Sequence, residues 1–144
     1  MKRMVAVALV ALAALPLTAC GLGMDASSAQ NDINQINPAD DAQAQANLQT
    51  AMVAAQQAYA ADGSWAGAGP SKLRQIEPSL TYVSGASSGP NVVSVASGGT
   101  SWSAAILSSS GMCFFAVAST AGGTHTGSGK APSCVASSAA QYAG

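Results

Sequence analysis

The stretch that decides the fold is Asn37–Gly63, which reads NPADDAQAQANLQTAMVAAQQAYAADG. Asn37 suits a helix cap, Pro38 suits the first helical position, and Asp40 lies near the positive end of the helix dipole. No further Gly or Pro interrupts the chain before Gly63, which provides a C-terminal stop. Apolar side chains recur at spacings of three and four, at Ala44, Leu48, Ala51, Met52, Ala55 and Tyr59. The pattern predicts one amphipathic helix from Pro38 to about Ala61 that packs one face.

Beyond this helix the apolar period changes to two. A connector between Trp65 and Leu80 contains a predicted short helix at Ser71–Ile76. Four runs rich in β-branched and aromatic residues follow, at Leu80–Val83, Asn91–Ala96, Ser101–Leu107 and Met112–Ala118. Their short Ser/Gly-rich connections favour antiparallel hairpins, and residues 119–129 are again rich in Gly, Thr and Ser. The sequence predicts an α+β fold, with one long N-terminal helix packed on a small antiparallel β-sheet.

The composition predicts a thin hydrophobic core and excludes one class of partner. The chain of 144 residues contains 32 Ala, 20 Ser and 15 Gly, and only 26 large apolar residues lie beyond Cys20. Charged residues make up 8% of the chain, against about 25% in ordinary domains. With five Lys and Arg residues and a net charge of -1, the chain lacks the basic patch that nucleic-acid binding requires.

The first twenty residues have the pattern of an export signal. Lys2 and Arg3 precede a largely apolar stretch of 16 residues, Met4–Ala19, which is shorter than the roughly 20 residues of a membrane-spanning helix. The next feature, Leu17-Thr18-Ala19-Cys20, resembles the bacterial lipobox, in which the Cys is diacylated after cleavage. We therefore expect three parts: a lipoprotein signal peptide at 1–19 that is removed, a lipidated N-terminus and flexible tether at 20–36, and a domain at 37–144.

Two alternatives stay open for this region: an ordinary cleavable signal with a chance Cys20, and an ordered extension in place of the tether. On the lipobox reading, the protein is exported, anchored to the cell membrane through lipid on Cys20, and faces the extracytoplasmic side. Two acyl chains supply the anchoring that one chain alone does not.

The remaining cysteines, Cys113 and Cys134, are expected to form a disulfide. An exported protein enters an oxidising environment, and with Cys20 lipidated these two remain as a pair. Two free thiols are the alternative. A metal site is not expected, because two Cys and the single His125 fall short of the usual four ligands.

Several segments resemble the globular domain of bacterial type IV pilins and pseudopilins, of the actinobacterial type. The stretch from Asp41 to Trp65 is similar to the C-terminal half of the long pilin helix, with Tyr59 before an Asp-Gly-Ser-aromatic turn. The run Glu77-Pro-Ser-Leu-Thr-Tyr-Val and the later Gly111-Met-Cys113-Phe-Phe, with residues 124–127 and Cys134, are similar to pilin-like heads. The resemblance covers about residues 38–136. It implies a helix laid against an antiparallel sheet, and a C-terminal disulfide loop closed by Cys113 and Cys134.

The chain departs from the pilin pattern at its N-terminus, and this departure shapes the expected function. A pilin carries a Phe-Thr-Leu-Ile-Glu start and a long apolar helix, neither of which is present. We expect a non-enzymatic, lipid-anchored surface protein, an accessory or interaction component of a type IV pilus or related secretion system. The alternative is an independent adhesin or a lipoprotein that binds a glycan or another ligand with the same fold.

Candidate chemistry is sparse, and no catalytic residue, metal or cofactor is expected. His125 lies in a Gly/Thr-rich segment and is interpreted as a solvated loop residue. The carboxylates are scattered along the chain, at Asp25, Asp32, Asp40, Asp41, Asp62 and Glu77. Trp65 and Trp102 are a candidate ligand platform, although a core this thin is expected to need most of its aromatic rings.

Overall fold

A computed structural model describes residues 38–143. The predicted signal peptide, the predicted lipidation site at Cys20, the predicted tether and the predicted cap at Asn37 all lie outside the described residues. Within them, a long helix α2 (Pro38–Asp62) is followed by η1 (Trp65–Gly67), α3 (Pro70–Ile76) and a five-stranded sheet. The strands are β1 (Thr81–Val83), β2 (Val92–Ser97), β3 (Ser101–Leu107), β4 (Cys113–Ser119) and β5 (Gly123–Gly129), and the chain ends with η2 (Ala136–Ser138) and α4 (Ala139–Tyr142).

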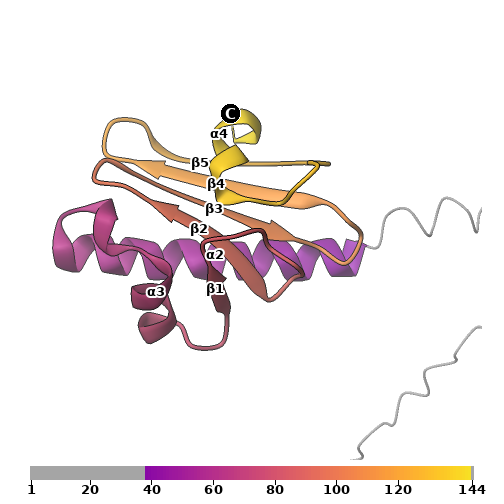
Figure 1. The fold of residues 1–144 in the computed structure, drawn as a ribbon, viewed down its shortest axis with the longest axis horizontal. Coiled ribbons are helices and arrows are strands. Elements are labelled where there is room, and N and C mark those ends of the chain that lie inside the picture. The colour runs from indigo at the N-terminus through magenta and orange to yellow at the C-terminus, as the bar shows by residue number, and fades with distance from the viewer. Residues whose placement is uncertain (1–37, 144) are drawn as a thin grey trace, which may run out of the picture.

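The predicted helix is confirmed almost residue for residue. Its buried side chains are Ala44, Leu48, Ala51, Ala54, Ala55 and Ala58. Gly63 ends it with a positive φ of 66°, a conformation that glycine adopts without steric cost, and its N–H donates to Tyr59 O at 2.7 Å. Because most of the buried positions are alanines, the helix backbone can lie close to the sheet along its whole length (Figure 1).

The sheet is mixed, so the expected all-antiparallel arrangement is wrong at one pair. The strands follow one another in the order β1-β2-β3-β4-β5, and β1 runs parallel to β2. Because the two strands are parallel, the loop between them is not a hairpin. Ser87 in this loop is only 5% exposed. Ser87 N donates to Cys134 O at 2.8 Å, and its hydroxyl accepts from Leu107 N at 2.8 Å. These bonds attach the loop to the end of β3 and to the C-terminal tail, ahead of the point where the chain enters β2.

The fifth strand was not expected from the sequence. Residues 119–129 look like a small-residue loop, but β5 pairs with β4 along its entire length, from Ser119 opposite Gly123 to Cys113 opposite Gly129. Gly123 has a φ of 73° and makes the turn into β5. Strand pairing uses main-chain groups, so small side chains do not prevent it.

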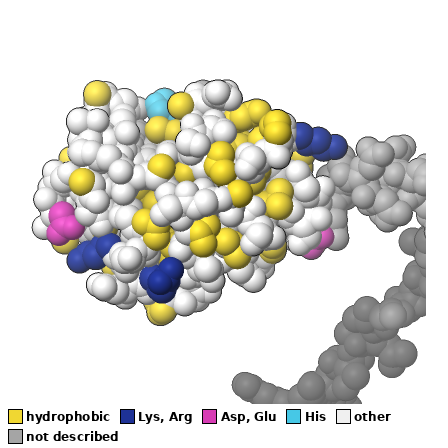
Figure 2. Space-filling model, in the orientation of Figure 1, with side chains coloured by type: hydrophobic (Ala, Val, Ile, Leu, Met, Phe, Trp, Pro, Cys, Tyr) yellow, Lys and Arg dark blue, Asp and Glu magenta, His cyan; other side chains and the backbone are white. Residues whose placement is uncertain are grey.

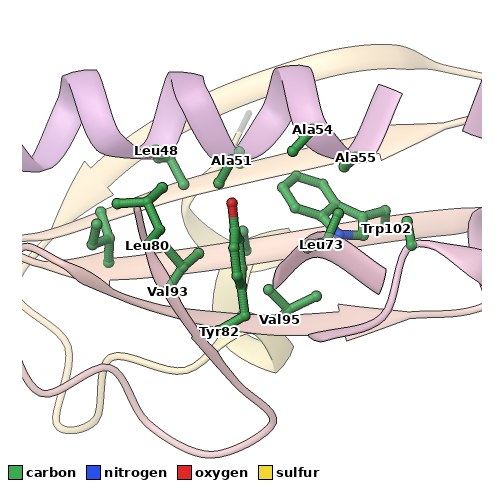
Figure 3. Close-up of a cluster of buried hydrophobic side chains, with 14 of the residues drawn as sticks. Leu48, Ala51, Ala54, Ala55, Leu73, Leu80, Tyr82, Val93, Val95 and Trp102 are labelled. Carbon is green, nitrogen blue, oxygen red and sulfur yellow. The ribbon is translucent and has the colours of Figure 1, made fainter. Parts of the chain in front are cut away.

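Alternation along the strands gives the sheet two covered faces. On one face, which we call the helix face, α2 and α3 pack on Tyr82, Val93, Val95, Trp102 and Ile106 (Figure 3). On the other, the tail face, η2 and α4 lie near Ala105, Cys113 and Phe115. Figure 1 shows α4 beside β4 and β5 and α3 beside β1, so the two ends of the sheet have different neighbours. The expected α+β class is confirmed, with the C-terminal tail as a third layer.

Candidate functional site

A groove of about 230 Å³ lies between α2 and β5 and is the best candidate for a binding site in the described part of the chain. The helix contributes Gln45, Leu48, Gln49 and Met52, and β4 contributes Phe114 and Phe115. The far wall is formed by residues 126–128 of β5. The groove therefore combines an apolar floor with polar walls.

The helix wall follows from the helical period. Positions 45, 48, 49 and 52 are three and four residues apart and lie on one side of α2. Leu48 is buried and Met52 is half-buried, whereas Gln45 and Gln49 are exposed. The two amide side chains therefore stand at the rim, with donors and acceptors available above an apolar floor.

The strand wall follows from the register of β5 on β4. Thr126 lies opposite Ala116 and Ser128 lies opposite Phe114, and both of those β4 residues belong to the helix-face core. The hydroxyl side chains of β5 therefore point toward the same side of the sheet as α2. No lining residue of this groove carries a charge. The face seen in Figure 2 is mostly hydrophobic and uncharged polar, with only a few Lys, Arg, Asp and Glu side chains.

On the tail face, β5 is covered by the end of the chain. A Cβ added at Gly127 would lie 1.7 Å from Tyr142 O, and one added at Gly129 would lie 2.8 Å from Tyr142 Cδ1. The Tyr142 ring stacks on Phe115, with centroids 4.7 Å apart. Glycine at these two positions is what lets the tail approach the sheet, which the sequence did not reveal.

The predicted disulfide is confirmed. Cys113 at the start of β4 is bonded to Cys134, with Cα atoms 5.7 Å apart. The bond ties the tail to the same strand that carries Phe115, so the tail is held at two places on β4. Cys20, the predicted lipidation site, lies outside the described residues.

The two tryptophans proposed as a ligand platform are buried. Trp102 is 1% exposed and Trp65 is 6% exposed, and Trp65 stacks on Tyr59 with ring centroids 4.4 Å apart. Figure 3 shows the Trp102 ring beneath Ala54 and Ala55 of α2. Neither ring presents a face to solvent, because the core uses both to fill the space beside small alanine side chains.

The polar residues considered for catalysis do not converge in the described part of the chain. His125 is exposed on β5, with Nε2 2.8 Å from Gly122 O. The Asp41 carboxylate accepts from Ser110 Oγ, which itself lies 2.8 Å from Ser108 Oγ, so this chain of hydroxyls joins the start of α2 to the β3–β4 turn. Hydrogen bonds from Ser79 lower the pKa of the Glu77 carboxyl below its ordinary value. Each of these contacts organises a turn or helix end.

Across residues 38–143, no cluster of three or more His, Cys, Asp or Glu side chains is arranged to hold a metal ion. The same residues include no helix long and apolar enough to cross a membrane. The comparisons add no identification, since no family model, curated protein or solved structure matches the chain.

The sequence does not predict the groove between α2 and β5. Gln45 and Gln49 are visible in the sequence beside Leu48 and Met52, but they look like the ordinary polar arc of an amphipathic helix. Their meaning depends on β5, and β5 was hidden because its residues are small and polar. The groove is therefore not predicted for the same reason that β5 is not predicted.

Proposed function

We propose that this protein is a non-enzymatic, lipid-anchored surface protein whose pilin-like domain serves as an accessory or interaction component of a type IV pilus or related secretion system. The observation that carries the proposal is the disulfide between Cys113 and Cys134, which belongs to an oxidising compartment, in a chain that begins with an export pattern ending at Cys20. Export and lipidation together explain the segment that precedes the domain.

The domain supports the pilin-like part of the proposal at the level of architecture. A helix of 25 residues lies along a sheet, and a disulfide joins the start of the fourth strand to the C-terminal tail. The resemblance in residues 41–65 and 111–134 falls on these same elements. The link to pilus machinery is an analogy of fold, and a fold alone does not determine function.

Anchoring is tested by labelling cells with a fatty-acid analogue and separating the membranes. The protein is expected to carry the label and to sediment with membranes, whereas Cys20→Ala loses both properties. Cys113→Ala is the matched control, since it removes a cysteine outside the lipobox and should keep the label. An unlabelled protein, or a Cys20→Ala variant that stays in the membrane, contradicts the proposal.

The association with a pilus or secretion machine is tested in the cell. Deletion of the gene is expected to reduce assembly or secretion, and crosslinking of the anchored protein in intact cells should capture a component of the machine. A strain with normal assembly and no such crosslink would contradict this part of the proposal while leaving the anchor untouched.

The groove between α2 and β5 favours a second candidate, an independent adhesin or ligand-binding lipoprotein. Exposed amides at Gln45 and Gln49 above the Leu48 and Phe114 side chains offer hydrogen bonds and an apolar surface in one place. Surface binding that persists in a strain lacking all pilus genes would support this candidate over the first.

A further inference from the structure

The two edge strands of the sheet differ in length and in what covers them. The β1 edge has three residues and is closed by α3, from which Arg74 Nη2 donates to Tyr82 O at 3.0 Å. The β5 edge has seven residues, and in the described part of the chain no strand lies beyond it. The outward main-chain groups of β5 therefore form an open row of hydrogen-bond donors and acceptors.

The β5 edge also lacks the usual devices that discourage pairing. Natural edge strands are commonly short or carry Pro, Lys or inward-pointing charges. The sequence of β5, Gly-Thr-His-Thr-Gly-Ser-Gly, contains no proline and no formally charged side chain. Thr124, His125, Thr126 and Ser128 are all exposed. Its side chains leave the row of main-chain groups accessible.

The α2–β5 groove runs beside this edge and limits what can occupy it. Ligand pockets for small molecules and cofactors usually enclose about 300–1,000 Å³, and the groove, at about 230 Å³, is smaller. A space of this size suits one large side chain. In strand addition, main-chain hydrogen bonds provide affinity and pockets for alternate side chains provide specificity.

We propose that β5 binds an extended, uncharged peptide segment of a partner protein by strand addition, with one apolar side chain of that segment entering the α2–β5 groove. The main chain of the segment pairs with the open edge of β5. Its apolar side chain lies against Leu48, Met52 and Phe114, and the amides of Gln45 and Gln49 face its neutral peptide groups. This inference rests on the proposed function only in that an interaction component needs a partner.

A second copy of the chain fits the same edge less well. Two β5 strands could pair through their main chains, but the residues that β5 presents toward the helix side are Thr124, Thr126 and Ser128. These short hydroxyl side chains would leave the apolar floor at Leu48 and Phe114 without a partner. A charged ligand also fits poorly, because no lining residue carries an opposite charge.

The experiment uses full-length protein purified from membranes in detergent and four blocked heptapeptides. The peptides alternate threonine and valine and differ only at the central residue, which is leucine, phenylalanine, lysine or glutamate. Fluorescence anisotropy of the labelled peptides measures affinity, and hydrogen exchange of the protein locates the site. We expect the leucine and phenylalanine peptides to bind about tenfold more tightly than the charged ones, a difference of about 1.4 kcal/mol, and to slow exchange in Gly123–Gly129.

Two controls separate strand addition from simple groove binding. A leucine peptide N-methylated at alternate residues, on the edge that would face β5, lacks the main-chain donors and should not bind. Gln49→Glu places a charge on the groove rim and should shift preference toward the lysine peptide by about two- to fivefold, the size of an exposed ion pair. Gln56→Glu is the matched control on the same helix, exposed and outside the groove, and should leave all four affinities unchanged.

Three results would overturn the inference. They are binding weaker than about 1 mM for every peptide, equal binding of the N-methylated peptide, or exchange protection of Gly123–Gly129 that grows with protein concentration in the absence of peptide. The last would assign the edge to a second copy. Peptide binding by a protein that carries no lipid would instead uphold the inference while contradicting the anchor, so the two proposals fail separately.

Discussion

The two faces of the sheet are covered by different means, although they belong to the same strands. The helix face packs aromatic and aliphatic side chains, such as Tyr82, Trp102 and Ile106, against the alanines of α2. The tail face has few large side chains and is held by a disulfide, by the Phe115–Tyr142 stack and by buried serines. A chain with few large apolar residues concentrates them on one face and secures the other with specific links.

Buried serines hold the tail face together by hydrogen bonds, in place of large apolar side chains. Ser94 is fully buried, and its hydroxyl accepts from Ala136 N at 2.9 Å. Ser87 joins the β1–β2 loop to the tail through Cys134 O and to the end of β3 through Leu107 N. Because buried polar groups are costly when unpaired, the Ser94 hydroxyl and the Ser87 main-chain N–H each fix one position of the tail rather than a range of positions.

The contrast between the two faces predicts that the largest loss of stability comes from a substitution on the helix face. Trp102→Ala removes a ring that is 1% exposed and packs beneath α2. Truncation of a buried Trp typically costs 3–5 kcal/mol, so we expect a decrease of about that size in the free energy of unfolding. Denaturant titration measures it, and Val53→Ala, at an exposed position on α2, serves as the control. A loss below about 1 kcal/mol would mean that the helix face is not the main source of stability.

Removal of the disulfide tests the tail face directly. The Cys113–Cys134 bond closes a loop with a sequence separation of 21, for which chain entropy predicts about 3 kcal/mol. We expect the double variant Cys113→Ser/Cys134→Ser to unfold at a lower temperature and to exchange its amide protons faster in residues 134–143 than in α2. An unchanged melting temperature would contradict the role of the bond as a stabiliser.

Much of the helix face could be predicted from the sequence, whereas on the tail face only the Cys113–Cys134 disulfide could. The 3.6-residue period of α2, the glycine stop at Gly63 and the two-residue period of β3 each report a buried apolar side, because burial of apolar groups repeats with the geometry of the element. The residues of the tail face show no comparable apolar period in the sequence. Strand β5 consists of Gly, Thr, Ser and His125, and its contacts on the tail face depend on where Tyr142 lies after folding.

The same reason explains the errors at the candidate site. The sequence makes the two tryptophans a candidate platform because it does not report which aromatic rings the core needs, but Trp65 and Trp102 are both buried. The loop between the parallel strands β1 and β2 is tied at Ser87, whose partners at Leu107 and Cys134 are distant in sequence. Local patterns cannot report hydrogen bonds between distant segments.

A smaller effect is expected from closing the space between β5 and the tail. Gly127→Ala introduces a Cβ that would lie 1.7 Å from Tyr142 O, so α4 must move away from the sheet. We expect a loss of about 1–3 kcal/mol, the usual cost of overpacking, with Tyr142 becoming more exposed. Gly99→Ala is the matched control, because nothing lies within 4 Å of a Cβ at that position. Equal melting temperatures for the two variants would show that the tail is not held where the glycines place it.

The smallest expected change at neutral pH is Tyr82→Phe, on the helix face. The Tyr82 ring is 1% exposed, and within the described residues its hydroxyl is buried without a hydrogen-bond partner. Figure 3 shows this hydroxyl directed toward Ala51 of α2. Removing an unpaired buried hydroxyl while keeping the ring should leave stability unchanged or raise it slightly, because the cost of burying the polar group disappears. A marked loss at pH 7 would reveal a partner for this hydroxyl.

At alkaline pH, the unfolding free energies of the native sequence and of Tyr82→Phe should diverge. Burial, and to a smaller extent the nearby Glu77 carboxylate, raises the pKa of Tyr82 to about 12, whereas the unfolded chain keeps the ordinary value of about 10. Below pH 10 both states hold the proton and Tyr82 adds no pH dependence. Between pH 10 and 12 the unfolded state loses the proton first, so the stability of the native protein falls as pH rises. Tyr82→Phe lacks this contribution, and its unfolding free energy should decline less steeply over that interval, since the lysines and the other tyrosines are common to both proteins. Parallel declines in the two proteins would mean that the helix face admits water to Tyr82, and the contrast between the faces would then be weaker than their burial implies.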